Sequence, residues 1–114
     1  MSHPARTYHL VPRDHWESCD PEADYLPEPF AEDGFIHTTH QPEELIAVAN
    51  RYYRDDPRPY LVLHIDVSRV RAPIAIEDPG GRYPHIYGPL NRDAIVAVTE
   101  VERDEGGAFR SLAL

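Results

Sequence analysis

The chain contains no lysine, and all 11 of its basic residues are arginine. A Schiff-base or lysine-nucleophile mechanism is therefore excluded, because both need the amine of a lysine side chain. Arginine remains available for planar, bidentate recognition of phosphate or carboxylate. The basic side chains thus favour anion binding over covalent catalysis.

Cysteine and activated serine are also scarce. Cys19 is the only cysteine, which excludes an internal disulfide and a multi-cysteine zinc site. It lies next to Asp20, and a carboxylate disfavours the reactive thiolate, so we interpret Cys19 as structural. No serine is flanked by the glycines of a nucleophile elbow, which excludes that type of serine hydrolase. His37 and His40 are three residues apart, but no HExxH pattern exists, and we expect no metal site.

Long apolar runs and a basic surface are missing as well. No run approaches the roughly 18 apolar residues of a membrane helix, and residues 1–6 lack the apolar core of a secretory signal. A cytoplasmic protein without membrane contact is therefore expected. The formal net charge of −9 disfavours nucleic-acid binding over the whole surface, although it leaves room for a local pocket. A chain of 114 residues fits one domain.

Hydrophobic periodicity predicts two main helices and five or six strands. The helices are expected over residues 12–18 and 42–53, and the strands over 6–11, 34–39, 60–67, 73–77 and 94–101. The acidic, proline-rich segment 20–32 is interpreted as a solvated loop, with a lid as the alternative. His64 and Asp66 share a face of their strand, which favours a structural hydrogen bond over a catalytic pair.

These elements predict an α+β fold: one small domain with a curved, mostly antiparallel sheet. The domain is expected over residues 6–102, between a flexible N-terminus at 1–5 and a polar C-terminal tail at 103–114 that frays.

Two runs carry most of the chemistry, Gly34-Phe35-Ile36-His37-Thr38-Thr39 and Tyr83-Pro84-His85-Ile86-Tyr87-Gly88-Pro89-Leu90. The prolines and the glycine hold the second run in one shape and prevent a regular strand through its length. Glu77 ends a short strand beside a glycine loop, although it could equally be a solvent-exposed strand end. A pocket is predicted from His37, Thr38, Glu77, Tyr83, His85 and Tyr87. Such residues can stack on a planar ring, fix its hydrogen bonds and stabilise a cationic sugar-like transition state.

The same runs, together with the segments 8–11, 42–53 and 61–67, Trp16 and Glu77, resemble the bacterial domain of unknown function family nine-fifty-two. The resemblance covers residues 8–101. The fold of that family is similar to that of the ADP-ribosyltransferases and the RNA 2′-phosphotransferases, whose split, curved sheet holds NAD in a cleft.

The resemblance implies NAD as the cofactor. It implies catalytic roles for His37, Glu77 and His85, and cofactor binding by His37, Thr38, Thr39, Tyr83, Tyr87, Arg13 and Arg92. His37 with the two threonines is similar to the ribose-binding histidine motif, without its intervening glycine. The expected function is binding of NAD or a nucleotide-like ligand, with transfer or hydrolysis of ADP-ribose. The alternative is a non-catalytic module that binds a small molecule or a protein and keeps the fold without the chemistry.

Overall fold

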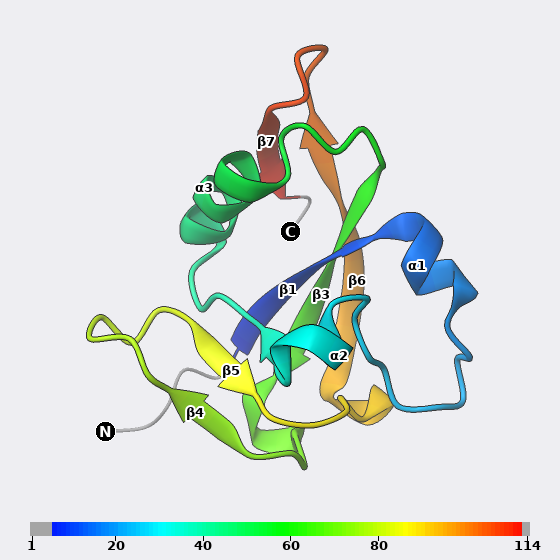
Figure 1. Cartoon of the computed structure of the whole chain (residues 1–114), viewed down its shortest axis with the longest axis vertical. Coiled ribbons are helices and arrows are strands. Elements are labelled where there is room, and N and C mark those ends of the chain that lie inside the picture. Colours follow the sequence, from blue (N-terminus) through cyan, green and yellow to red (C-terminus); the bar gives the residue numbers. More distant parts are fainter. Residues whose placement is uncertain (1–5, 113–114) are drawn as a thin grey trace.

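The computed structural model describes residues 6–112, so the predicted flexible segment 1–5 lies outside them. The described part contains seven strands, three α-helices and two short 3-10 helices, arranged as an α+β fold (Figure 1). The strands are β1 (Arg6–Pro12), β2 (Ile36–His37), β3 (Tyr60–Asp66), β4 (Ile74–Ile76), β5 (Pro84–Ile86), β6 (Ile95–Arg103) and β7 (Phe109–Leu112). The helices are α1 (Arg13–Ser18), α2 (Phe30–Asp33) and α3 (Pro42–Tyr52), with η1 (Val67–Arg69) and η2 (Arg92–Ala94) as the 3-10 helices. The predicted fold class is confirmed.

The larger sheet is antiparallel and has the strand order β1-β3-β6-β7. β3 lies inside it, as its run of apolar residues predicts, and both of its faces are buried. Because side chains alternate along a strand, Leu61, Leu63 and Ile65 enter one core cluster, whereas Tyr60 and Val62 enter a second cluster beneath α3. The structure thus has two small cores on opposite faces of β3.

His64 and Asp66 do not form a catalytic pair. The Nε2 atom of His64 lies 2.8 Å from the hydroxyl of Thr99, and Asp66 accepts hydrogen bonds from the backbone and the hydroxyl of Ser68. The structural interpretation of these two residues is confirmed.

The smaller sheet has the order β2-β5-β4 and brings the two histidine-bearing runs together. His37 on β2 lies directly opposite His85 on β5. β2 is shorter than the predicted strand over 34–39, because the chain changes sheets there. The backbone of Thr38 still bonds to Pro84, but that of Thr39 pairs with Tyr8 of β1. This crossing joins the two sheets.

α3 begins with Pro42 and buries Leu45 and Ala49, as predicted. α1 is confirmed too, and Trp16 packs against the first core cluster. None of the helices within residues 6–112 is long and apolar enough to cross a membrane.

The C-terminal segment corrects the prediction of a fraying tail from Arg103. β6 extends to Arg103, and Phe109–Leu112 returns as β7, antiparallel to it and beside α3 (Figure 1). Asp104 closes the turn by accepting hydrogen bonds from the N–H groups of Gly106 and Ala108. Phe109 then enters the second core cluster. One buried aromatic ring is the physical reason why this polar segment is ordered.

The segment 20–32 is irregular, as predicted, but it is anchored to the core and not simply solvated. Tyr25 is fully buried, and its backbone forms a bridge with Leu90. Pro29 precedes the single turn of α2, which ends at Gly34 in the left-handed conformation that glycine adopts without strain (φ 78°).

Candidate functional site

A cleft lies between α3, the segment 27–33, and strands β1, β2 and β5. It has two adjoining compartments, which we call the deep compartment (about 180 Å³) and the wide compartment (about 640 Å³). The two share the wall residues Pro29, His37, Thr39, Val48 and Tyr53. The wide compartment falls in the size range of pockets for small organic ligands, roughly 300–1,000 Å³.

One face of α3 forms a wall of the wide compartment. Val48, Arg51 and Tyr52 lie at i, i+3 and i+4 and therefore point the same way from the helix. Tyr83 faces the compartment just before β5, and its hydroxyl donates to Glu44 in the first turn of α3 (3.3 Å). The helix thus supplies part of the wall and also holds the tyrosine expected to stack on a ligand.

His37 and His85 line the wide compartment together, as the sequence predicts for a shared pocket. Their ring centroids are 5.5 Å apart, and the Phe35 ring stacks on His85 with a centroid distance of 4.1 Å. Each histidine has a carboxylate partner. Nε2 of His37 is 3.0 Å from Asp33, and Nδ1 of His85 is 3.2 Å from Glu77.

Glu77 and Tyr87 line neither compartment, in contrast to their predicted place in the pocket. The Tyr87 hydroxyl donates to Glu77, and this bond, followed by the one from His85, lowers the pKa of the Glu77 carboxyl. An ionised carboxylate can only accept hydrogen bonds, so Nδ1 of His85 donates this one, and in the neutral imidazole Nε2 keeps a lone pair. Glu77 is therefore linked to the cleft only by its hydrogen bond with His85.

The Thr38 hydroxyl is used inside the protein, and the backbone of Thr39 joins the two sheets. The buried Thr38 hydroxyl accepts a hydrogen bond from Thr7 (2.8 Å) and donates one to the carbonyl of Pro84 (2.7 Å). Thr39 is buried too, and its backbone is paired with Tyr8. Thr38 therefore has no hydroxyl proton left for a ligand.

Arg13 and Arg92, which the resemblance implies as phosphate-binding residues, lie away from the cleft. Arg13 pairs with Glu100 (2.7 Å). Arg92 donates to the carbonyls of Asp20 and Ala23 and covers the Trp16 ring at 4.5 Å. Both guanidinium groups are used to hold the structure together, and the arginines that line the cleft are Arg51 and Arg58.

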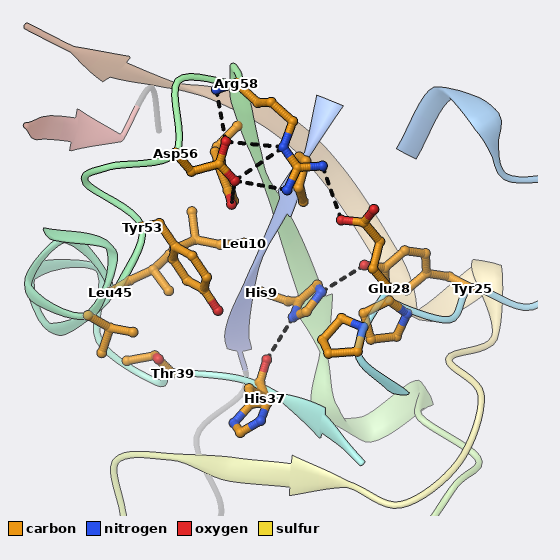
Figure 2. A pocket seen from close by; sticks show the side chains of 15 residues that line it. His9, Leu10, Tyr25, Glu28, His37, Thr39, Leu45, Tyr53, Asp56 and Arg58 are labelled. Atoms are coloured by element: carbon orange, nitrogen blue, oxygen red, sulfur yellow. Dashed lines mark hydrogen bonds and ion pairs between the residues drawn. The ribbon is translucent and has the colours of Figure 1, made fainter. Parts of the chain in front are cut away.

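The deep compartment contains a buried pair that sequence reasoning missed, His9 and Tyr25 (Figure 2). Nδ1 of His9 is 2.7 Å from the carbonyl oxygen of His37, and Nε2 is 2.8 Å from the Tyr25 hydroxyl. A carbonyl only accepts, so Nδ1 carries the proton and Tyr25 donates to Nε2. His9 therefore fixes the backbone of His37, while the His37 ring is directed away from it (Figure 2).

Burial lowers the pKa of His9 to about 4, although the hydrogen bond to the His37 carbonyl opposes the shift. The unfolded chain takes up this proton near pH 6.5, so it binds more protons than the folded state between pH 6.5 and 4. The contribution of His9 to stability is therefore complete above pH 6.5 and is lost as the pH falls towards 4. We expect the free energy of unfolding to fall by about 2 kcal/mol between pH 7 and pH 5 from His9 alone.

Urea unfolding at pH 7 and pH 5 measures this difference. Burial also lowers the pKa of His64, which adds a smaller change of the same sign. The decisive comparison is therefore with His9→Gln, which should be less stable at pH 7 but show a clearly smaller loss at pH 5. An unchanged pH dependence in His9→Gln contradicts the assignment.

The far end of the deep compartment is formed by Arg58, Asp56 and Glu28 (Figure 2). Arg58 pairs with Asp56 (2.8 Å), Glu28 (3.2 Å) and Asp14 (3.4 Å). Hydrogen bonds from Arg58, and a further one from Tyr60, keep the pKa of the Asp56 carboxyl well below its usual range. This end of the cleft therefore carries more negative than positive charge.

No group of three or more histidine, cysteine or acidic side chains is placed to hold a metal ion, as far as the described residues extend. The cleft can instead hold an organic ligand, because aromatic rings, two histidines and an arginine line a volume of suitable size.

The fold and the cleft define a small α+β domain with a mixed polar and aromatic cleft. The chain belongs to the family described as protein of unknown function (DUF952), whose profile matches residues 10–98. The family assigned from the sequence is thus confirmed.

Solved structures of another protein share this fold. The crystal structure of protein CC0527 from Caulobacter crescentus is 21% identical, with a TM-score of 0.76, and the match covers 92% of this chain and 93% of that one. The solution NMR structure of CC0527 is also 21% identical, with a TM-score of 0.70 and 90% of each chain covered. No curated protein matches the sequence.

Proposed function

We propose that the cleft binds NAD or another nucleotide-like ligand, with its planar ring in the wide compartment. The observation that carries this proposal is the wall formed there by Tyr83, His37 and His85 around a volume of about 640 Å³. Aromatic and imidazole rings stack on a planar base, and histidine nitrogens can hydrogen-bond to ribose hydroxyls. The resemblance to the ADP-ribosyltransferases, in which a histidine binds the ribose, supports the same placement for His37.

The His85–Glu77 pair supports hydrolysis of NAD as the reaction. Nε2 of His85 accepts a proton from a water molecule as the water oxygen bonds to C1′ of the nicotinamide ribose. The bond between C1′ and the pyridinium nitrogen breaks at the same time, and nicotinamide leaves with the electron pair. Glu77 stabilises the protonated imidazole, as carboxylates do for catalytic histidines.

A non-catalytic binding module is the second candidate, and the position of Glu77 favours it. A carboxylate that stabilises a cationic sugar must lie in the cleft, whereas Glu77 lies outside the wall. Asp33 is the acidic residue of the wide compartment, and it is paired with His37.

Calorimetric titration with NAD and ADP-ribose tests binding, and an assay for nicotinamide released from NAD tests catalysis. We expect binding in the wild type, at least about tenfold weaker binding in His37→Ala, and loss of nicotinamide release in His85→Ala. His15→Gln is the matched control, because His15 lies outside the cleft and the glutamine retains a donor for the Leu26 carbonyl.

Absence of binding at millimolar concentration refutes the nucleotide ligand. NAD that is bound but never consumed identifies the chain as a binding module. Equal activity of wild type and His85→Ala rules out the proposed base.

A further inference from the structure

The two arginines of the cleft differ in how their charges are balanced. Arg58, in the deep compartment, pairs with three carboxylates. Arg51, in the wide compartment, forms no ion pair with any residue between 6 and 112, and its guanidinium carbon lies 6.0 Å from the centre of the Tyr52 ring. Only Arg51 therefore offers a guanidinium group whose hydrogen-bond donors are not already used by the protein.

The deep compartment is closed to anions by its own charges. Glu28 and Asp56 line this end together with the single guanidinium group of Arg58, and the exposed Asp14 pairs with Arg58 from outside the lining, so the lining carries one more negative than positive charge. A phosphate entering this end has to displace a carboxylate that is already held by hydrogen bonds, and it is repelled by the others. Neutral hydroxyl or amide donors meet no such barrier.

The geometry of α3 directs Arg51 towards the ligand. Arg51 follows Val48 by one helical turn, and both line the wide compartment. The same compartment holds the two histidines and Tyr83, where the planar ring of the proposed ligand stacks. An anionic group attached to that ring through a ribose therefore comes within reach of α3.

We infer that Arg51 binds the anionic group of the ligand, a phosphate or diphosphate, and that the deep compartment takes only the uncharged end. This inference deepens the proposed function and rests on it for the identity of the ring. It assigns the phosphate contact to α3 and not to Arg13 or Arg92. It also predicts that a ligand with an anionic group at each end binds poorly.

Calorimetry with ADP-ribose and with adenosine separates the contribution of the phosphates. Arg51→Gln removes the charge and should weaken ADP-ribose binding at least about tenfold, because charge-assisted hydrogen bonds to phosphate are lost. Adenosine affinity should stay within about twofold, since it has no phosphate to lose. The control Arg71→Gln removes one equal charge at an exposed position outside both compartments and should change neither affinity.

Equal affinity of wild type and Arg51→Gln for ADP-ribose overturns the inference. A second probe tests the anion site at Arg51 without relying on the proposed nucleotide ligand. Inorganic pyrophosphate should shift the amide resonances of residues 48–53 in wild type and not in Arg51→Gln. Failure of both adenosine and ADP-ribose to bind, with the pyrophosphate shifts present, refutes the nucleotide but retains the anion site. Absence of the pyrophosphate shifts refutes the anion site.

Discussion

Replacement of Tyr25 by alanine is expected to lower the free energy of unfolding by about 3–5 kcal/mol, as full truncation of a buried aromatic side chain does. Tyr25 is fully buried, and its ring lies 5.5 Å from that of Trp16 and 5.4 Å from that of His9. Alanine leaves a cavity between α1 and the first core cluster. It also leaves Nε2 of His9 buried without its donor, which adds to the cost.

Urea unfolding followed by Trp16 fluorescence measures the loss, with Tyr52→Ala as the matched control. Tyr52 is 67% exposed, and its truncation should change stability by no more than about 0.5 kcal/mol. Tyr25→Phe separates the two causes, because it keeps the ring and removes the hydroxyl, and it should cost about 1–3 kcal/mol. Similar stabilities for Tyr25→Ala and Tyr52→Ala contradict the assigned burial.

Most of the elements could be predicted because their signals are local. β3 is a continuous apolar run between turns, and α3 combines proline at its start with buried residues at helical spacing. The pairing of His37 with His85 agrees with the pocket predicted from the two runs. For β3 and α3, the local pattern along the chain is enough to predict the element.

The deep compartment could not be predicted in the same way. Tyr25 lies among prolines and carboxylates, and nothing in that composition separates it from a solvated loop residue. His9 occupies an ordinary strand position and becomes part of the site only because Tyr25 and the His37 carbonyl meet it from distant parts of the chain. The two aromatic residues of this segment, Tyr25 and Phe30, indicate only that part of it can be buried, and not which residue meets His9.

The role of a charged residue depends on which residues it pairs with in the fold, and the composition does not reveal these partners. Eleven arginines offer many candidates for a phosphate site, and the sequence contains no pattern that tells Arg51 from Arg13. The fold decides, because it places Glu100 against Arg13 and leaves Arg51 on the cleft wall. Glu77 was predicted in the same pocket as His85, but the pairing of β4 with β5 places it next to His85 and outside the lining of both compartments.

The C-terminal segment provides the second large effect, and Phe109→Ala is expected to lower the free energy of unfolding by about 3–5 kcal/mol. Phe109 is 2% exposed and packs edge-on against Tyr60 at 5.5 Å, with the Arg103 guanidinium group 4.1 Å from its ring centre. A fraying tail predicts no change at all, so the substitution discriminates between the two descriptions of residues 103–112. Urea unfolding at pH 7 measures it.

Arg110→Ala is the control, because it alters the neighbouring residue of β7 at a side chain that is 65% exposed. Its weak pair with Asp104 (3.8 Å) should contribute less than about 1 kcal/mol. The backbone of Phe109 bonds to both ends of the Asn50 amide, and these bonds survive in the alanine variant. Any large loss therefore comes from the missing ring, whereas equal stability of the two variants shows that β7 adds little to the second core cluster.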